Sequence, residues 1–245
     1  MSIYQFYKQF WTPQYWRNYC EREDPLVKYR QNNEREILSA FLKNINKKIL
    51  VLEAGCGYGR ISRIIKENPN INLIVSDLSS SMVAECIGKT TGRVIGCVAN
   101  IEELPFKDSI FDGVLCTGVL MHLEDENKAL FEMARVLKKN GFIIISVNNI
   151  LSPFSPAVIL HTILKRNYIQ RFRTPAFCIS KLHKNGFFIE NVCCDTIFGL
   201  RLNVLKLKFP PSILLPIYRL MDKIAQISIL RYLGYELWFF VRKSL

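Results

Sequence analysis

Residues 49–60 have the sequence Ile-Leu-Val-Leu-Glu-Ala-Gly-Cys-Gly-Tyr-Gly-Arg, and this stretch decides the fold. Its first four residues are apolar, as in a parallel strand that is buried on both faces. The glycines permit a sharp turn and let a ligand approach backbone atoms without a Cβ in the way. Ile61, Ile64 and Ile65 then recur at helical spacing, and a helix N-terminus points bare N–H groups at such a ligand. The order strand, glycine loop, helix predicts a nucleotide-type site in an α/β fold, although a tight turn without a ligand would give the same order.

The glycine spacing and one acid narrow the class of ligand. A dinucleotide-binding fingerprint is G-x-G-x-x-G, and after Gly55 and Gly57 its third glycine would fall at Arg60. The chain instead has G-x-G-x-G, completed by Gly59, with Glu53 two residues before the first glycine. A carboxylate at that place would repel a pyrophosphate, so a cationic ligand fits better.

With these residues the chain resembles the class I S-adenosylmethionine-dependent methyltransferases, and among them the small-molecule type 11 domain. Their first motif is an acid followed by G-x-G-x-G at the end of the first strand. The resemblance covers about residues 45–150 well and the remainder in outline. It implies an α/β fold with a doubly wound, mostly parallel seven-stranded sheet, a helical N-terminal lid and a C-terminal helical insertion before the last strand. It also implies S-adenosyl-L-methionine as the cofactor. The lack of C-x-x-C and the presence of only three histidines argue separately against a metal site.

A second strand, residues 71–76, ends in Asp77, which lies 24 residues after Glu53. In doubly wound folds an acid about 20 residues past the glycine loop holds ribose hydroxyls. A carboxylate can accept hydrogen bonds from both hydroxyls of a diol. The alternative is that Asp77 only caps the helix expected over 80–88. Leu78 and Met82 are expected either to line the adenine pocket or to belong to the core.

A third strand over 93–98 is followed by Ala-Asn-Ile-Glu-Glu-Leu-Pro-Phe at 99–106. This segment resembles the adenine-binding segment of the family, in which an acid usually stands where this chain has Asn100. An amide oxygen can also accept from the adenine amine, and the Ile101 N–H is a second candidate contact.

The fourth strand, residues 111–116, ends at Cys116. Ligands of open parallel sheets bind beyond the carboxyl ends of the strands, at the switch point in strand order. We therefore expect Glu53, Asp77, Asn100 and Cys116 to converge there. His122 follows the fourth strand and is the candidate general base, if the acceptor loses a proton. The alternative is a hydrogen-bonded packing residue.

The chain is long enough for one methyltransferase domain, residues 1–245. We divide it into an N-terminal helical cap (1–44), the cofactor-binding core (45–150), and acceptor-side elements with the last strands (151–245). The aromatic stretch 4–19 is expected to be a helix, and similar methyltransferases use such a segment as a lid; plain packing is the alternative.

Several further elements are expected from pattern alone. Residues 20–32 look like a charged loop, and 33–44 like a helix leading into the first strand. A helix over 127–138 is expected to stop at the basic, glycine-ended run 138–141. The remaining expected elements are a fifth strand over 143–147, a helix over 175–185, a sixth strand over 187–193, an insertion over 199–235 and a last strand over 236–242.

Charge is distributed unevenly along the chain. Residues 151–245 hold 14 Lys and Arg against 4 Asp and Glu, whereas residues 1–150 hold 19 against 17. Such asymmetry suggests an anionic partner, or else a solvated surface. Within the insertion, apolar residues recur at helical spacing with charged residues between them. We favour a helix packed on the core or at a dimer interface over a basic amphipathic helix on an anionic membrane.

The substrate class is less well defined. No Asn/Asp-Pro-Pro-aromatic motif of amino-methylating nucleic-acid enzymes follows the fourth strand, so nucleic acid is the less favoured partner. We expect methyl transfer to a small-molecule, lipid or glycan-intermediate acceptor. The alternatives are an RNA methyltransferase that uses the basic C-terminal part, and a catalytically inactive cofactor-binding protein.

The N-terminus lacks a continuous apolar segment typical of a signal peptide, and the chain has eight cysteines but no C-x-x-C. We expect reduced thiols and a cytoplasmic location, with peripheral contact at the inner face of the membrane as a further option. The sequence does not indicate an oligomeric state.

Overall fold

The computed structural model describes residues 12–21, 24–90, 94–123, 125–164, 171–196, 210–226 and 229–244. Its centre is a seven-stranded sheet in the order β3-β2-β1-β4-β5-β7-β6. All neighbouring strands are parallel except β7, which runs antiparallel to both β5 and β6. The strands are β1 (Ile49–Ala54), β2 (Ile71–Asp77), β3 (Val94–Val98), β4 (Phe111–Cys116), β5 (Leu137–Asn148), β6 (Phe187–Cys194) and β7 (Glu236–Lys243).

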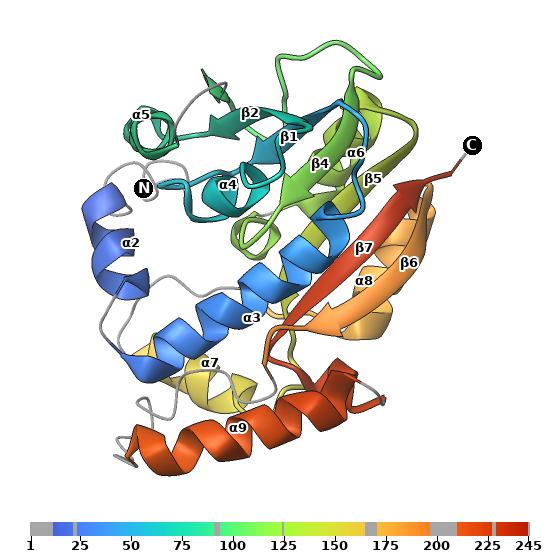
Figure 1. Ribbon diagram of the computed structural model, residues 1–245. Helices are drawn as coiled ribbons and strands as arrows, with labels where there is room; N and C mark the ends of the chain where they lie inside the picture. The colour runs from blue at the N-terminus through green and yellow to red at the C-terminus, as the bar shows by residue number, and fades with distance from the viewer. Residues whose placement is uncertain are drawn as a thin grey trace.

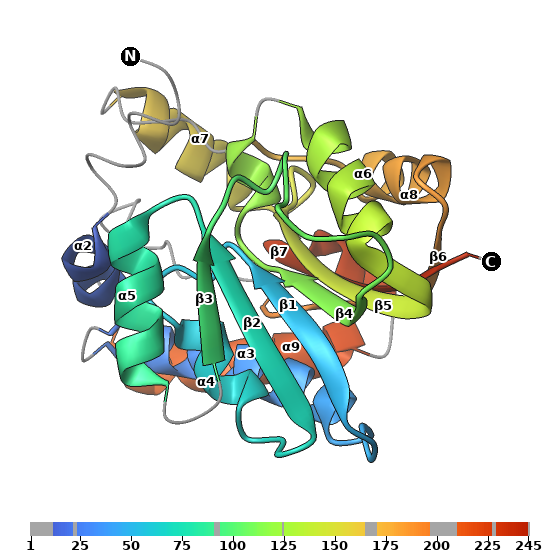
Figure 2. The same cartoon turned by 90° about the horizontal axis from the view of Figure 1, so that it is seen from above.

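Helices cover both faces of this sheet, as Figures 1 and 2 show. The apolar cluster on one face contains residues of α3, α4 and α5, and the cluster on the other face contains residues of α6 and α8. The described helices are α2 (Pro13–Cys20), α3 (Pro25–Leu42), α4 (Arg60–Ile65), α5 (Ser80–Lys89), α6 (Glu126–Val136), α7 (Ser155–Leu164), α8 (Pro175–Lys184) and α9 (Pro211–Gln226), with short 3-10 turns η1 (Leu120–His122) and η3 (Ile229–Leu233). The predicted doubly wound, mostly parallel seven-stranded fold is confirmed.

β1 lies at the point where the strand order reverses. It pairs with β2 on one side and β4 on the other, so that Glu53 is opposite both Val75 and Leu115. The chain winds from β1 outward to β3, then returns to β4 on the opposite side. Ligand sites of open parallel sheets lie at this switch point, beyond the carboxyl ends of the strands.

The predicted loop over 20–32 is wrong from Pro25 onward, because α3 begins there and continues to Leu42. Asp24 is the N-cap: its Oδ1 accepts a hydrogen bond from the Leu26 N–H at 2.9 Å. Proline at the first helical position loses no helical hydrogen bond and already has a helical φ. The charged residues after Pro25 therefore form the polar face of a helix, and the charged pattern does not indicate a loop there.

The predicted helix stop at 138–141 is also wrong. α6 already ends at Val136, and β5 begins at Leu137. Leu137 is fully buried and pairs with Phe111 of β4, and the register shifts before Phe142 pairs with Gly113. The extra residues are thus taken up as an irregularity in the strand, with Asn140 at φ 59°.

Part of the predicted N-terminal lid and of the insertion lies outside the described residues. Residues 1–11 and 197–209 belong to this part. In the described part, α2 is joined to α5 by an ion pair between Arg17 and Glu85 at 3.3 Å. α9 lies against α3, where Leu26 packs with Leu214 and Tyr218 (Figure 1). No helix among the described residues has the length and hydropathy needed to span a membrane.

Candidate cofactor site

The predicted site residues lie at one edge of the sheet. Glu53 is the penultimate residue of β1, Asp77 is the last of β2, and Cys116 is the last of β4. Asn100 follows β3, and the neighbouring Ala99 N–H donates to the Asp77 carbonyl at 3.0 Å. The pairing of neighbouring strands thus brings these positions together at the carboxyl edge, around the switch point.

Glu53 is a buried carboxylate, with 1% of its surface exposed. The Ser62 hydroxyl of α4 donates a hydrogen bond to its Oε2. Among the described residues it forms no ion pair. Burial raises its pKa well above the ordinary value, and the Ser62 hydrogen bond opposes that rise. A cation beside this carboxylate would favour its ionised form, so the position suits a positively charged ligand.

The glycine loop is held from two sides. The backbone N–H of Gly57 donates to Asp77 Oδ2 at 2.9 Å. On the other side, a Cβ built on Gly55 would lie 2.2 Å from Val119 Cγ2 of the loop after β4, so only glycine permits this close approach.

Gly57 lies at the open side of this loop. Its φ is +52°, and a Cβ added to it would meet nothing within 4 Å. Its backbone therefore faces room for a ligand, and a side chain there would project into that room. The donor set and the open backbone beside a buried acid fit a nucleoside with a cationic substituent.

Asp77 does not cap α5. The N-cap is Ser79, whose hydroxyl accepts from the Met82 N–H at 3.4 Å. The Asp77 Oδ1 instead accepts from the Ser79 N–H at 2.9 Å. Burial raises the pKa of Asp77, while the N–H groups of Ser79, Gly57 and Leu78 lower it. The pure-cap alternative is therefore wrong, and the carboxylate links β2 to the glycine loop.

The segment after β3 turns back on itself at Asn100. The Asn100 Oδ1 accepts from the Glu102 N–H at 3.0 Å, and its carbonyl accepts from the Glu103 N–H at 3.0 Å. Ile101 is buried, with 8% exposed, and joins the apolar core. Leu78 and Asn100 are each half-buried. These positions lie at the carboxyl edge, on the β2–β3 side of the sheet.

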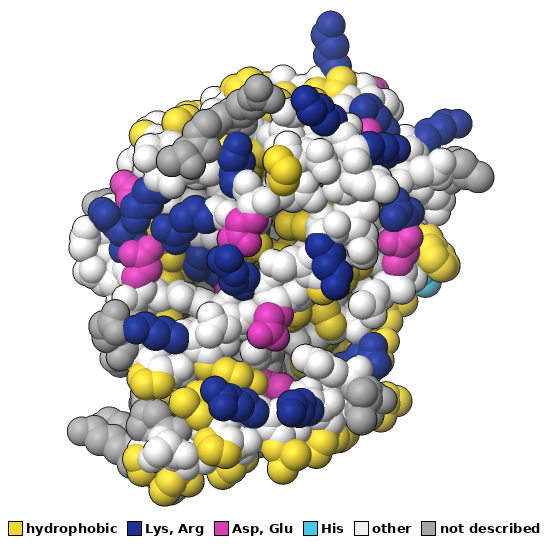
Figure 3. Space-filling view, viewed as in Figure 1, with side chains coloured by type: hydrophobic (Ala, Val, Ile, Leu, Met, Phe, Trp, Pro, Cys, Tyr) yellow, Lys and Arg dark blue, Asp and Glu magenta, His cyan; other side chains and the backbone are white. Residues whose placement is uncertain are grey.

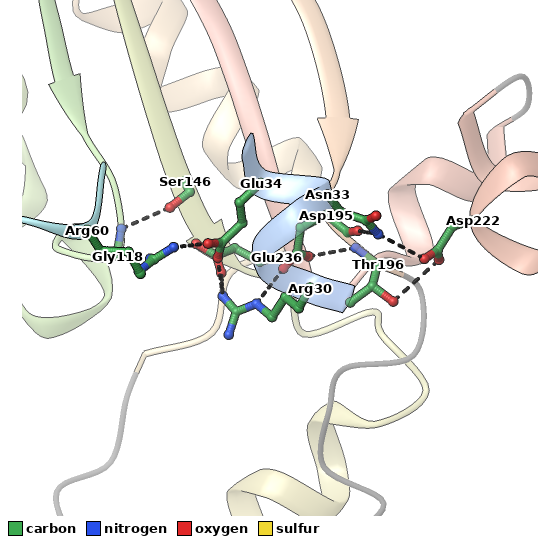
Figure 4. A network of polar contacts seen from close by, with 10 residues as sticks. All are labelled: Arg30, Asn33, Glu34, Arg60, Gly118, Ser146, Asp195, Thr196, Asp222 and Glu236. Atoms are coloured by element: carbon green, nitrogen blue, oxygen red, sulfur yellow. Dashed lines mark hydrogen bonds and ion pairs between the residues drawn. The ribbon is translucent and has the colours of Figure 1, made fainter. Parts of the chain in front are cut away.

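A hydrogen bond that the sequence did not indicate holds the loop after β4 in place. The Gly118 N–H donates to the hydroxyl of Ser146, a fully buried serine of β5, at 2.9 Å (Figure 4). This bond fixes the loop beside Gly55. Cys116 itself is fully buried in the core, so contact with a ligand from that position would come from its backbone.

His122 ends the short turn η1 and is only 7% exposed. Burial lowers its pKa to about 3, and a hydrogen bond with the Gly118 backbone works in the opposite direction. The ring is thus neutral near pH 7 and closely packed behind the loop that follows β4.

Arg60, which follows the glycine loop, pairs with Glu34 of α3 (Figure 4). Glu34 also pairs with Arg30 at 3.1 Å, and Arg30 reaches Asp195 at 2.7 Å and Glu236 of β7. Carboxylate oxygens of Glu34, Asp195 and Glu236 lie within 4.8 Å of one another. The two guanidinium groups supply positive charge to this buried cluster.

The cluster of Arg30, Glu34, Arg60, Asp195 and Glu236 joins distant parts of the chain. Burial raises the pKa of Asp195 to about 6, an effect that Arg30 opposes and Glu236 enhances. No local sequence pattern indicates this cluster, because its members come from α3, α4, the residue after β6, and β7.

An open cavity of about 690 Å³ lies between α2 and α5. Its lining residues include Arg17, Glu85 and Lys89. Its lining comes from Thr12, α2 and α5, and no residue of the glycine loop contributes to it. The part of the N-terminus that is described therefore packs on the β2–β3 side of the molecule.

Comparison with known proteins gives a consistent picture of the core. Residues 52–145 match the model of a methyltransferase domain. An uncharacterized protein of Methanocaldococcus jannaschii is 38% identical over 150 residues, which cover 60% of this chain and 61% of that protein. The tRNA (carboxymethyluridine(34)-5-O)-methyltransferase of Arabidopsis thaliana is 29% identical over 156 residues, which cover 62% of this chain and 37% of that protein.

A ubiquinone/menaquinone biosynthesis C-methyltransferase of Haemophilus ducreyi is 35% identical over 108 residues, 40% of each chain. The matches thus span about three fifths or less of the length of these curated relatives.

Two solved structures share the fold over nearly the whole chain. A possible histamine N-methyltransferase of Thermotoga maritima has a TM-score of 0.68 at 19% identity, covering 99% of this chain and 100% of that one. The magnesium protoporphyrin IX methyltransferase of Synechocystis with bound S-adenosylhomocysteine has a TM-score of 0.68 at 15% identity, with the same coverage.

Proposed function

We propose that this chain, whose residues 52–145 match a methyltransferase domain, is a class I S-adenosylmethionine-dependent methyltransferase that transfers the methyl group to a small-molecule, lipid or glycan-intermediate acceptor. The observation that carries the cofactor site is the Glu53 carboxylate, which is buried beside an open glycine loop without an ion-pair partner among the described residues. The cofactor, S-adenosylmethionine, supplies a methyl group already activated on a sulfonium sulfur.

In this proposal the residues at the end of each strand contact one part of the cofactor. Glu53 faces the cationic methionine portion, and the loop of Gly55, Gly57 and Gly59 lets the ligand lie against the backbone. Asp77 holds the ribose with the acceptor capacity that its backbone hydrogen bonds leave. The adenine lies toward Leu78, Asn100 and Ile101, with the backbone of Cys116 on the β4 side. Because the methyl group is activated beforehand, the protein mainly positions the reactants and excludes water.

The elements after β5 favour an acceptor with an apolar portion. α7 begins seven residues after β5 ends, and its ten residues include no Asp, Glu, Lys or Arg. The backbone at Arg171, before α8, is fixed beside the loop after β4, because the Arg171 N–H donates to the Met121 carbonyl at 2.9 Å. Arg173 is held there by Glu126 at 2.7 Å. An uncharged helix on this side suits an apolar acceptor better than a polyanion.

The role of His122 stays a prediction. A general base works best when its pKa lies near the working pH. A pKa of about 3 is far from that range and favours a positioning role through Gly118.

RNA methylation is the second candidate. It is favoured by the similarity to a tRNA methyltransferase and by the excess of Lys and Arg in residues 151–245. It predicts RNA affinity that falls steeply as salt rises, because phosphate contacts release counterions.

The proposal is tested by following a radiolabelled methyl group from S-adenosylmethionine. The protein is incubated separately with total lipid, with the polar metabolite and glycan fraction, and with total RNA. We expect label in the lipid or polar fraction with the wild type and none with Asp77→Ala. Label in RNA alone would establish the second candidate instead. No label in any fraction, from protein that binds S-adenosylhomocysteine, would indicate a catalytically inactive cofactor-binding protein.

A further inference from the structure

The outer face of α9 carries a stripe of exposed apolar side chains. Ile213, Ile217, Leu220 and Ile224 are 55%, 46%, 60% and 38% exposed. Their spacing places them in one row along the helix. The opposite face packs inward, since Leu214, Tyr218, Asp222 and Ala225 are buried. We refer to the row of Ile213, Ile217, Leu220 and Ile224 as the α9 stripe.

Figure 3 shows hydrophobic side chains gathered along the lower edge of the molecule, over α9, with Lys or Arg side chains beside them. The exposed basic residues of α9 are Arg219 and Lys223. A long row of exposed apolar residues beside basic ones is typical of helices that lie in a bilayer interface.

A second apolar surface lies at the same end of the molecule. α7 exposes Leu160 and Ile163, at 57% and 51%, and the turn before it exposes Leu151 at 50%. In Figure 1, α7 and α9 both lie at the lower end. This end therefore presents apolar side chains from two helices.

Acidic residues are largely withdrawn from the C-terminal surface. Three of the four acids in residues 151–245, namely Asp195, Asp222 and Glu236, are buried. Asp222 points inward from α9, where its Oδ2 accepts from the Tyr29 hydroxyl at 2.7 Å. The fourth, Glu190, is paired with Arg242. Among the described residues of this part of the chain, the exposed charge is therefore mainly positive.

We propose that the α9 stripe docks on an anionic lipid bilayer, with its apolar side chains at the boundary between headgroups and acyl chains. Arg219 and Lys223 lie against the anionic headgroups. Complementary charge selects this occupant, because a second copy of the chain would bring like charges together on a protein of net charge +12. The inference does not depend on methyl transfer, and it would bring an enzyme with an apolar acceptor to the surface that contains such molecules.

Flotation with vesicles tests the inference on the full chain. The probes are phosphatidylcholine vesicles with and without 30 mol % phosphatidylglycerol, a fraction set at roughly that of an anionic membrane. We expect the wild type to float with the anionic vesicles and much less with phosphatidylcholine alone. Absence of binding to the anionic vesicles by folded protein would overturn the proposal.

Two variants separate the apolar and the charged contributions. Ile217→Asp with Leu220→Asp is expected to lower the partition coefficient at least about tenfold, because two apolar side chains no longer enter the interface. Arg219→Gln with Lys223→Gln is expected to lower it about thirtyfold at low salt, and less as salt rises. Phe131→Asp on α6, which is 62% exposed in the wild type, is the matched control and should float like the wild type.

Folding and self-association are checked in the same preparations. The substituted residues are exposed and away from the candidate cofactor site, so binding of S-adenosylhomocysteine and the thermal midpoint should match the wild type. Unchanged flotation of the stripe variant would overturn the assignment of the surface. A wild-type dimer in ultracentrifugation that the stripe variant abolishes, without vesicle binding, would assign the stripe to a copy of the chain and would also overturn it.

Discussion

Asp77 Oδ2 accepts a hydrogen bond from the backbone N–H of Gly57 at 2.9 Å, so the end of β2 is joined directly to the glycine loop after β1. The second oxygen accepts from the Ser79 N–H at the start of α5. One carboxylate thus shapes two turns at the switch point of the sheet. A carboxylate offers about four lone-pair sites, so acceptor capacity remains for a ribose hydroxyl beside these backbone donors.

Gly57→Ala should separate cofactor binding from stability. The left-handed backbone at Gly57 costs a non-glycine residue about 1 kcal/mol, but its added Cβ clashes with nothing in the protein. The methyl group would occupy the space that the proposal gives to the cofactor. We expect a free energy of unfolding about 1 kcal/mol lower and loss of S-adenosylhomocysteine binding in calorimetry.

Gly186→Ala is the matched control for this substitution. Gly186 has φ +77° and likewise an unobstructed Cβ position, but it precedes β6 at the sheet edge far from the switch point. It should show a similar loss of stability with unchanged binding. Equal binding by the two variants would place the ligand elsewhere.

The buried ion-pair cluster predicts a large effect of Arg30→Leu. Removal of this guanidinium leaves Glu34, Asp195 and Glu236 buried with Arg60 as the remaining cation of the cluster. Loss of one partner of a buried pair costs about 3 kcal/mol or more. Urea denaturation should show this loss at pH 7.

Arg35→Leu on the same helix serves as the control. Arg35 pairs with Glu67 at 2.7 Å, but both side chains are about half exposed, and such surface pairs contribute less than about 1 kcal/mol. A small effect of Arg30→Leu, comparable to that of Arg35→Leu, would contradict the structural importance of the cluster.

Burial of His122 predicts a pH-dependent contribution to stability. Its folded pKa of about 3 lies below the ordinary value near 6.5, so between these values the unfolded chain binds a proton that the folded chain does not. The stability contributed by neutral His122 is complete above about pH 6.5 and is lost as the pH falls, by up to about 1.4 kcal/mol per pH unit.

The wild type should therefore lose about 2 kcal/mol relative to His122→Asn between pH 7 and pH 5. Urea denaturation of both proteins at several pH values measures this difference. The exposed His183→Asn should follow the wild type. A difference between wild type and His122→Asn that is constant with pH would show that His122 does not titrate as described.

Catalysis gives a separate test of the same residue. If His122 only positions the loop after β4, His122→Asn should keep more than about a tenth of kcat, measured with the acceptor fraction that the radiolabel experiment identifies. General-base catalysis typically contributes 10²–10⁴-fold. A fall of that size, with unchanged binding of S-adenosylhomocysteine, would establish His122 as the base.

The sheet and its switch point could be predicted because they depend on local patterns. The apolar run of β1, the glycine spacing and Asp77 at the end of β2 each follow from a few consecutive residues. Local patterns predicted the wrong element where the same residues fit two kinds of structure. Charged residues after Pro25 hid a helix that Asp24 caps, and Lys138 to Gly141 looked like a helix stop although Leu137 already pairs with Phe111.

The long-range part of the site had no local signal. The bond between Gly118 and Ser146, and the cluster of Arg30 with Asp195 and Glu236, join residues that are far apart in sequence. The ion pair of Arg60 with Glu34 of α3 likewise becomes evident only once α3 is packed against α4. The α9 stripe could likewise not be predicted from the sequence, because the pattern does not show which face of α9 is covered by Tyr29 and Leu26 of α3.

Titration of the protein with S-adenosylhomocysteine by calorimetry, beside Asp77→Ala and Asp108→Ala, tests the central claim most directly. Asp108 is an exposed carboxylate that precedes β4 at the opposite edge of the sheet. The account predicts binding by the wild type and by Asp108→Ala, and at least about a hundredfold weaker binding by Asp77→Ala, because charge-assisted hydrogen bonding to the ribose is lost. Equal binding by all three proteins, or no binding by folded wild type, would contradict a cofactor site at the carboxyl ends of β1 and β2.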